Sequence, residues 1–205
     1  MAVTKSSRRW LDEHFSDEYV LRAQREGYRS RAAFKLLELD EKYGLIKKNM
    51  SIIDLGAAPG GWTEVVSRRL DGSGKIIASD ILDMAPVAGA DFVKGDFLEE
   101  ESLNAILALL GDAKADLVIS DMAPNMSGVD AVDQPKAMYL VELAVDLADQ
   151  TLATGGAFLA KVFQGEGFDQ LILDLRKKYG SVMVRKPQAS RPRSREVYVL
   201  ARGFK

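Results

Sequence analysis

From residue 50 onward, short apolar runs alternate along the chain with longer stretches whose apolar residues recur at helical spacing. The runs predict strands at 50–55, 75–80, 91–94, 116–120 and 156–162, and the stretches predict helices near 61–70, 99–110, 135–152 and 167–179. Strands that alternate with helices in this way form a mostly parallel sheet with helices on both faces. This part of the chain is therefore predicted to have an α/β fold.

The last part of the chain breaks this alternation. Two apolar runs, at 181–187 and 196–201, follow one another with no helical stretch between them, so we expect them to pair as a hairpin. One of the two must then run antiparallel to the other strands. If that strand is the final one, it begins at the edge of the sheet where the parallel strands end, and Glu196 opens it. The connection at 188–195 would form a basic loop at the same edge.

Ahead of the sheet, the pattern predicts short helices. Residues 7–26 suggest one or two, whose apolar positions are Trp10, Leu11, Phe15, Tyr19, Val20 and Ala23. Gly27 is suited to end this helical region and Ser30 to cap the next helix, which should run to about Tyr43. Lys35 lies beside the apolar stripe of that second helix rather than within it, so spacing alone predicts an ordinary surface lysine.

Composition limits the classes of protein that need to be considered. The chain has 205 residues, of which 47% are hydrophobic, and we expect one domain over 1–205 with an N-terminal helical extension at about 1–48. Cysteine is absent and His14 is the only histidine, which excludes disulfides, thiolate metal sites, histidine metal clusters and a serine triad. No apolar run approaches the length of a membrane span, so we expect a soluble, cytoplasmic protein without a metal, and a monomer by default.

Charge is distributed unevenly along the chain. Residues 1–48 hold 11 Lys/Arg against 8 Asp/Glu, residues 49–173 hold 7 against 20, and residues 174–205 hold 10 against 2, which gives net charges of +3, −13 and +8. An acidic middle between basic ends suits an enzyme that acts on nucleic acid, because basic segments bind phosphates. A solvated surface explains the first segment equally well, but it does not explain the strongly basic last one.

The stretch IIDLGAAPGGW at 52–62 runs from an apolar strand through a small-residue turn into a helix. Gly56, Gly60 and Gly61 would let a ligand approach the backbone closely. The spacing does not match G-x-G-x-x-G, the usual dinucleotide fingerprint. It fits better with the loop that S-adenosylmethionine-dependent methyltransferases place beneath the methionine half of their cofactor. The alternative is a tight turn of the kind found in any α/β protein.

Charged residues stand at the ends of three predicted strands. Asp80 ends the second strand, Asp121 follows the fourth, and Lys161 lies near the end of the fifth, inside an otherwise apolar run. Ligands of open α/β sheets bind in the crevice at the carboxyl ends of the strands. We therefore expect these side chains to converge on one crevice, together with Glu196 at the start of the last strand.

Seven stretches of the chain carry a family resemblance: RWLDEHFSD at 9–17, RSRAAFKL at 29–36, DLGAAPGGW at 54–62, SDMAPNMSG at 120–128, AMYLVELA at 137–144, KVFQGEG at 161–167 and SREVY at 194–198. With them the sequence resembles the FtsJ/RrmJ family of ribosomal RNA ribose 2′-O-methyltransferases, and the likeness covers nearly the whole chain, from about Ser7 to Arg202. The resemblance implies a Rossmann-like methyltransferase fold, S-adenosyl-L-methionine as cofactor, and a uridine ribose of 23S ribosomal RNA in the assembled large subunit as substrate. It also implies four catalytic residues: Lys35, Asp121, Lys161 and Glu196.

The implied reaction asks the enzyme to hold a ribose 2′-hydroxyl in line with the methyl group and to help it lose its proton. We hypothesise that Lys161 is the general base, provided that it is neutral when the hydroxyl arrives. In the alternative, Lys161 stays charged and orients the oxygen while Asp121 receives the proton. Lys35 enters this scheme through the resemblance alone.

Cofactor contacts are expected from the same edge of the sheet. Asp80 should accept hydrogen bonds from the cofactor ribose, although an Asp after a strand is also a common helix cap. The resemblance assigns Asp96 to the adenine amino group. The rest of the predicted set is Gly56, Gly60, Trp62 and Asp121. For Trp62, core packing is nearly as good an explanation as cofactor contact.

Basic side chains near these elements are expected to contact RNA. They are Arg29, Arg31, Arg185, Lys186, Arg191, Arg193 and Arg195. A 2′-hydroxyl distinguishes RNA from DNA, and phosphate contacts make affinity fall as salt rises. Two other classes stay open, a non-catalytic RNA-binding or ribosome-assembly protein and a nucleotide-dependent oxidoreductase. Within the methyltransferase class, transfer RNA and cap RNA are the alternative substrates.

Overall fold

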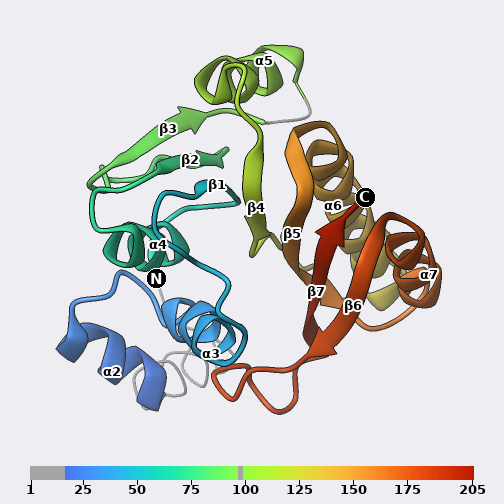
Figure 1. Cartoon of the computed structure of the whole chain (residues 1–205). Coiled ribbons are helices and arrows are strands. Elements are labelled where there is room, and N and C mark those ends of the chain that lie inside the picture. Colours follow the sequence, from blue (N-terminus) through green and yellow to red (C-terminus); the bar gives the residue numbers. More distant parts are fainter. Residues whose placement is uncertain (1–16, 97–98) are drawn as a thin grey trace.

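The computed structural model describes residues 17–96 and 99–205, and its centre is one seven-stranded sheet in the order β3-β2-β1-β4-β5-β7-β6 (Figure 1). The strands are β1 (Ser51–Leu55), β2 (Lys75–Asp80), β3 (Ala90–Lys94), β4 (Ala115–Ser120), β5 (Leu152–Phe163), β6 (Tyr179–Arg185) and β7 (Glu196–Phe204). The pairs from β3 to β5 are parallel, and β7 is antiparallel to both of its neighbours. The predicted α/β fold with an antiparallel last strand is confirmed.

Helices cover both faces of this sheet. Within the described residues they are α2 (Glu18–Glu26), α3 (Ala33–Tyr43), α4 (Gly61–Leu70), α5 (Glu100–Leu110), α6 (Asp130–Thr151) and α7 (Phe168–Lys178). α3 and α4 share one buried cluster with Ile52 and Leu117, whereas α5, α6 and α7 share another with Ile53 and Val118. Consecutive strand residues therefore point to opposite faces, as the period of two in a strand requires.

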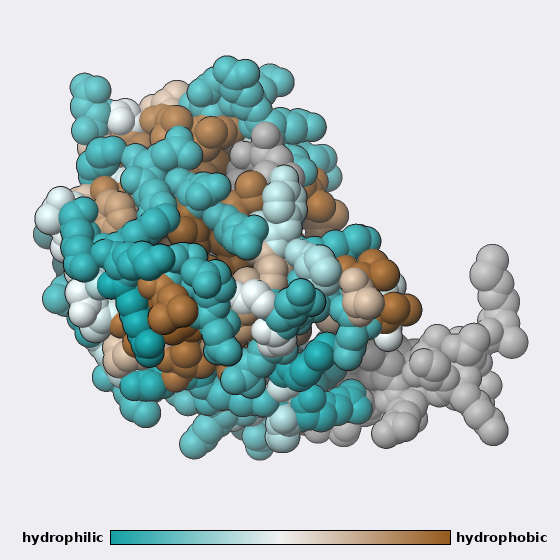
Figure 2. All heavy atoms as spheres, turned by 90° about the vertical axis from the view of Figure 1, so that its right-hand side faces the viewer, coloured by the Kyte–Doolittle hydropathy of each residue, from teal (hydrophilic) through white to brown (hydrophobic). Residues whose placement is uncertain are grey.

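The outer helix α7 illustrates how the sequence determines a face. It buries Leu171, Ile172 and Leu175, while its last turn, at 176–178, is basic and suits the negative end of the helix dipole. Figure 2 shows this side of the molecule as mostly hydrophilic, with apolar side chains in separate groups. Among the residues that the structure describes, no helix combines the length and the hydropathy needed to span a membrane.

α6 and β5 begin four or five residues before their predicted starts. α6 begins at Asp130 rather than at 135, so Pro135 lies inside the helix instead of opening it. Asp133 accepts hydrogen bonds from both amides of the preceding turn at 127–128, at 2.8 and 2.9 Å, and so supports a helix start ahead of the proline. β5 begins at Leu152 rather than at 156, with a shift in its register against β4 near the start of both strands.

The helices before the sheet agree only in part with prediction. α2 ends at Gly27, which is left-handed with φ 72° as expected. Ser30 does not cap α3, because Ala32 holds the N-cap position and makes no side-chain cap. The Ser30 hydroxyl is instead buried against Gly61, where it leaves no room for a Cβ. Among the predicted apolar positions, Trp10, Leu11 and Phe15 lie outside the described residues, as does most of the motif at 9–17.

Candidate active site

Several strands bring charged side chains to one edge of the sheet. Asp80 ends β2, Asp121 directly follows β4, and Lys161 lies near the end of β5. Because β7 runs in the opposite direction, its first residue, Glu196, pairs with Phe163 at the end of β5. The structure thus places the four sequence-predicted residues at the same edge.

Lys161 makes two contacts with a single residue, Asp121. Its Nζ donates a hydrogen bond to the backbone carbonyl oxygen of Asp121 at 2.5 Å and lies 3.2 Å from the carboxylate Oδ1. Only 9% of the Lys161 side chain is exposed. A buried ammonium group is costly unless it is paired, so the two residues form one ion pair at the sheet edge.

Lys35, from α3, forms a second ion pair. Its Nζ lies 2.7 Å from Glu196 Oε1, and only 8% of the residue is exposed. The prediction of an ordinary surface lysine, made from spacing alone, is therefore wrong. Glu196, on the last strand, supplies the negative charge that a buried lysine needs, and the pattern within α3 gives no sign of this partner.

The two ion pairs interact through Glu196. Burial raises the pKa of Glu196, but the charge and hydrogen bond of Lys35, the hydrogen bond of Ser190 and the charge of Lys161 together lower it by more. The net shift is downward. The Glu196 carboxylate therefore stays ionised at neutral pH and holds Lys35 at the site.

Tyr198 connects both pairs, although the sequence marked it only as part of a motif. Its hydroxyl donates a 2.6 Å hydrogen bond to Asp121 Oδ1, and its ring centre lies 5.5 Å from Lys35 Nζ. Burial raises the pKa of Tyr198 well above its ordinary value, so the hydroxyl remains a donor. The signal that identifies it is its position two residues after Glu196 in a strand, which places both side chains on one face.

The glycines of the 54–62 loop are packed against the protein's own side chains. At Gly56 the Met122 side chain takes the room that a Cβ would need, and at Gly61 the Ser30 side chain does the same. Side chains also approach Gly60 within 3.2 Å of where its Cβ would be. These glycines therefore permit close internal packing, a role that the sequence reasoning about ligand approach did not include.

Asp80 organises the backbone around this loop. Its Oδ2 accepts a hydrogen bond from the Ala58 amide, and its Oδ1 accepts one from the Leu82 amide, both at 2.8 Å. No helix begins in the described segment 81–89, so the helix-cap alternative for Asp80 is wrong. A carboxylate has about four acceptor positions, which leaves Asp80 capacity for further donors. The adjacent Ile81 and Leu82 are 62% and 61% exposed and form an apolar surface beside it.

Asp96 and Trp62, the two remaining residues predicted to bind the cofactor, lie in different surroundings. Asp96 comes two residues after β3 and close to Asp80, because the Gly95 amide donates to the Asp80 carbonyl oxygen at 3.0 Å. Trp62 is only 3% exposed, within the cluster shared by α3 and α4, and its Nε1 donates to the Ala32 carbonyl oxygen at 2.8 Å. Core packing therefore accounts for the Trp62 side chain.

Asp54, in β1 beneath the loop, is a buried acid that the sequence reasoning did not assign to the site. Its Oδ2 accepts a 2.6 Å hydrogen bond from Thr63 Oγ1, whereas its buried Oδ1 has no partner among the described residues. Burial raises the pKa of Asp54 to about 7; the Thr63 hydrogen bond opposes this shift, and Asp121 and Asp80 add to it. The sequence signal that could have identified Asp54 is its position as a charged residue inside an otherwise apolar strand.

Three arginines predicted to bind RNA form ion pairs within the protein, among them Arg191, whose Nε lies 3.9 Å from Asp17 Oδ2. Arg31 forms an ion pair with Asp17 and donates a hydrogen bond to the Ala189 carbonyl oxygen. Arg195 Nη2 lies 2.6 Å from Asp130 Oδ1. These contacts tie the loop between β6 and β7 to the start of α2 and to the start of α6, so the three arginines also position the rim of the site.

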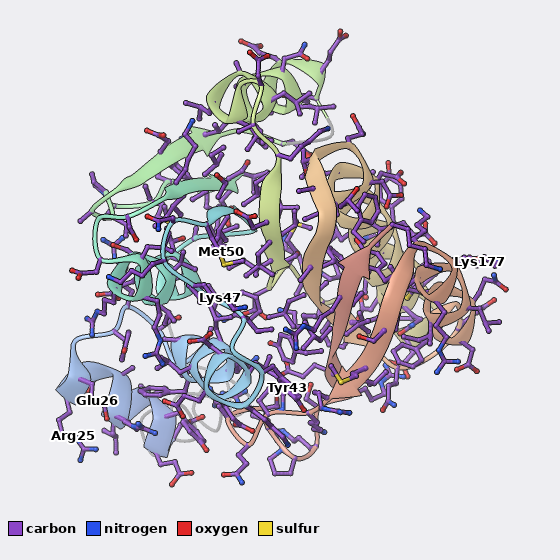
Figure 3. The ribbon with its side chains drawn as sticks, viewed as in Figure 1. Arg25, Glu26, Tyr43, Lys47, Met50 and Lys177 are labelled. Atoms are coloured by element: carbon purple, nitrogen blue, oxygen red, sulfur yellow. The ribbon has the colours of Figure 1, made fainter. Side chains whose placement is uncertain are left out.

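An open, basic cavity lies between α2 and the loop after β6. Its volume is about 490 Å³, and three arginines, Arg31, Arg191 and Arg193, outnumber the two acids, Asp17 and Glu18, in its lining. On the other side of this loop, Arg185 Nε donates to the hydroxyl of Tyr43, at the end of α3 that faces the β6–β7 hairpin (Figure 3). The predicted basic loop is thus held next to the helix that carries Lys35.

The fold and the site together define a class of protein. A parallel sheet carries an antiparallel strand between β5 and β6, and a glycine-rich loop leads from β1 into α4. An acidic residue ends β2, another follows β4, and two lysine–carboxylate pairs meet at the same edge. These features are the ones that the resemblance implied, and they define an α/β methyltransferase.

Comparisons with known proteins lead to the family. The chain matches the FtsJ-like methyltransferase family over residues 28–204. It is 61% identical over 202 residues to the ribosomal RNA large subunit methyltransferase E of Chromohalobacter salexigens. These residues make up 98% of this chain and 96% of that protein. The protein of the same name from Cellvibrio japonicus is 56% identical over 204 residues, covering 100% and 97%.

A solved structure agrees with this result. The crystal structure of a ribosomal RNA methyltransferase from Plasmodium falciparum has a TM-score of 0.75 at 31% identity, covering 86% of this chain and 98% of that one. The chain belongs to the FtsJ-like methyltransferase family.

Proposed function

We propose that this protein transfers the methyl group of S-adenosyl-L-methionine to the 2′-hydroxyl of a uridine ribose in 23S ribosomal RNA, within the assembled large subunit. The observation that carries the proposal is the pairing of Lys161 with Asp121 and of Lys35 with Glu196 at the carboxyl edge of the sheet. The resemblance implies the same four residues for catalysis. The names of the relatives, which specify the large ribosomal subunit, support this substrate.

The residues around the glycine-rich loop suit a cationic, nucleoside-bearing cofactor. Carboxylates end β2 and follow β3 and β4, and their negative charge complements a sulfonium group. Asp80 retains acceptor capacity for ribose hydroxyls beside the exposed apolar residues 81–82. We assign to the cofactor Gly56, Gly60, the backbone of Trp62, Asp80, Asp96 and Asp121.

The bound cofactor supplies a methyl group on a good leaving group, so the protein's task is to position the hydroxyl and to move its proton. Lys161 Nζ and Asp121 Oδ1, 3.2 Å apart, offer a donor and an acceptor to one hydroxyl. Lys161 takes the proton if it is neutral, or orients the oxygen while Asp121 takes it. Tyr198 fixes the Asp121 carboxylate, and Lys35, held by Glu196, stabilises the developing negative charge on the oxygen.

RNA is the proposed substrate because basic side chains surround the same edge of the sheet. Arg191 and Arg193 line the open cavity beside α2, and Arg31 lies four residues before Lys35. In this proposal the chain is a single methyltransferase domain over 1–205, and the helical part up to about residue 48 contacts RNA. Phosphate contacts of this kind weaken as salt rises.

Transfer of labelled methyl groups from S-adenosyl-L-methionine to large subunits from cells that lack the enzyme tests the proposal. Wild type, Lys161→Ala and Lys177→Ala are compared, and the labelled nucleotide is mapped. We expect label at a ribose 2′-oxygen, and a rate lower by ~10²–10⁴-fold in Lys161→Ala, the usual contribution of general acid–base catalysis. Lys177, on α7 and remote from this edge (Figure 3), is the control and should retain the wild-type rate.

Each other outcome has a definite meaning. Label on transfer RNA or cap RNA alone would keep the chemistry and overturn the substrate. No transfer to any RNA, with the cofactor still bound, would identify an RNA-binding assembly factor instead of an enzyme. A near-normal rate of Lys161→Ala at saturating RNA would contradict both proton routes.

A further inference from the structure

We propose that Arg29 is a positioning residue of the cofactor site and not, as the sequence suggested, an RNA contact; this inference rests on the proposed cofactor. The Arg29 guanidinium donates hydrogen bonds to the carbonyl oxygens of Ala85 and Pro86, both at 2.5 Å, and of Pro59 at 3.4 Å. Pro59 belongs to the glycine-rich loop, and the other two carbonyls belong to the segment after Asp80. One side chain therefore joins the two backbone segments that border this acid.

The segment at 81–89, which connects β2 to β3, contains neither helix nor strand and depends on side-chain contacts for its position. Asp80 holds its first residues, and Ser67 holds its far end through a 2.6 Å hydrogen bond to a carbonyl oxygen. Arg29 holds its middle. The exposed apolar residues 81–82 lie on this segment, so its position determines the surface that borders the proposed ribose site.

Gly60 provides the room through which Arg29 crosses the loop. A Cβ at Gly60 would lie 2.9 Å from Arg29 Nη1, 3.1 Å from Arg29 Cδ and 3.2 Å from Met84 Sδ. The backbone at Gly60, with φ 104°, also favours glycine. The glycine in the motif and the arginine in the linker therefore fit together, and the crossing is a built feature of the loop.

The linker that carries Arg29 is itself fixed to α4. The Arg29 amide donates to Glu64 Oε2 at 3.1 Å. Arg68 donates to the Gly27 carbonyl oxygen and pairs with Glu64 Oε1, both at 2.8 Å. Because α4 begins directly after the glycine-rich loop, the linker, the loop and α4 form one unit. An RNA phosphate would have to compete with three carbonyl oxygens for the Arg29 guanidinium.

The consequence concerns cofactor affinity. Without Arg29, the segment at 81–89 loses two short, charge-assisted hydrogen bonds, so cofactor binding must also order this segment. We expect Arg29→Ala to raise the Kd for S-adenosylhomocysteine by roughly 10–100-fold. Arg29→Lys should raise it by about 10-fold, because an ammonium group cannot reproduce the planar fork that reaches both carbonyls.

Isothermal titration calorimetry of the purified 205-residue protein with S-adenosylhomocysteine measures this effect without catalysis. Arg25→Ala is the matched control, since the Arg25 side chain is 78% exposed on α2 and points away from the site (Figure 3), and its Kd should equal that of wild type. In Arg29→Ala, hydrogen exchange should accelerate at 83–89 while β1 and β4 stay protected, which separates local loosening from a failure to fold.

RNA binding provides the opposing test. In the absence of cofactor, both Arg29 variants should bind large subunits with the same affinity as Arg25→Ala. Wild-type affinity for S-adenosylhomocysteine in both Arg29 variants would overturn the inference. Subunit binding that is lost in Arg29→Ala and kept in Arg29→Lys would also overturn it, because a phosphate contact tolerates lysine. Failure of wild type to bind S-adenosylhomocysteine would overturn the proposed cofactor, and the inference with it.

Discussion

The hydroxyl of Tyr198 reaches across β5, from β7 to Asp121 after β4, and donates a 2.6 Å hydrogen bond to Oδ1. The same oxygen lies 3.2 Å from Lys161 Nζ. Two donors on one oxygen fix the rotation of the carboxylate. The Tyr198 ring also packs 5.7 Å from that of Trp62, so the core of the protein determines the orientation of this acid.

Tyr198→Phe should therefore lower kcat by about 10-fold, since a hydrogen bond to a charged group contributes about 1.5 kcal/mol or more. The aromatic ring and its packing are kept, so the melting temperature should change little. Tyr179→Phe is the control, because the buried Tyr179 hydroxyl, in β6, has no hydrogen-bond partner among the described residues. Equal kcat values for the two variants in the methyl-transfer assay would contradict the positioning role.

The position of a candidate site residue was predictable where the order of the strands decides it. Asp121, Lys161 and Glu196 follow from the rule that parallel strands end at one edge. Lys35 does not, because its burial depends on a partner from the other end of the chain, and only the family resemblance implied it. Tyr198 was missed for the same reason: its hydroxyl finds Asp121 only after three strands are assembled.

The N-terminal turn of α6 holds both the loop that follows β4, which leads to Asp121, and the loop that follows β5, which carries Lys161. Asp133 accepts hydrogen bonds from the amide and hydroxyl of Ser127, both at 2.8 Å, in the loop after β4. Its neighbour Gln134 donates from Nε2 to the carbonyl oxygens of Phe163, the last residue of β5, and of Glu166, in the loop that follows, at 3.2 and 3.0 Å. Adjacent residues of one helix therefore set the separation of these loops.

Gln134→Ala should loosen the loop after β5, because two backbone carbonyls lose their donor. We expect a loss of about 1–2 kcal/mol in the free energy of unfolding, measured in urea, and faster hydrogen exchange at 164–168. Activity should fall as well, since Lys161 lies just before this loop. Gln150→Ala, at the exposed far end of α6, is the control and should leave all three properties unchanged.

At the scale of elements, the sequence predicted more of the fold than of its boundaries. The strands and helices from residue 50 onward are confirmed because each has a clear period and a sheet or helix face to bury. The start of α6 and the missing Ser30 cap were not predictable. Both depend on contacts with a turn or a loop that is brought close only by the tertiary structure.

Buried charge also affects the stability of the whole molecule. Burial raises the pKa of Asp54 to about 7 in the folded protein, whereas in the unfolded chain it is near its ordinary value of about 4. Between these two values the folded state keeps a proton that the unfolded state has released. This group's contribution to stability is therefore full below about pH 4, falls as pH rises toward 7, and is constant above that.

Asp54→Asn should remove this dependence while it keeps an acceptor for the Thr63 hydroxyl. Wild type should lose about 2–3 kcal/mol of this contribution to its unfolding free energy between pH 5 and pH 8, and the variant should not. The unfolding free energy of the variant minus that of wild type should therefore rise by this amount over that range. Urea unfolding at several pH values measures the difference, in which the other titrating groups cancel. A difference that is constant across this range would show that Asp54 has an ordinary pKa in the folded state.

The ion pair between Lys35 and Glu196 joins residues roughly 160 positions apart, from the helix before the first strand and from the last strand of the sheet. Closing a flexible chain over that length costs about 4–5 kcal/mol of entropy, more than one ion pair returns. The contact must therefore wait until pairing of the intervening strands has shortened the distance. A refolding chain thus acquires its sheet before this ion pair, and compact molecules that still lack the pair are the natural intermediates of this topology.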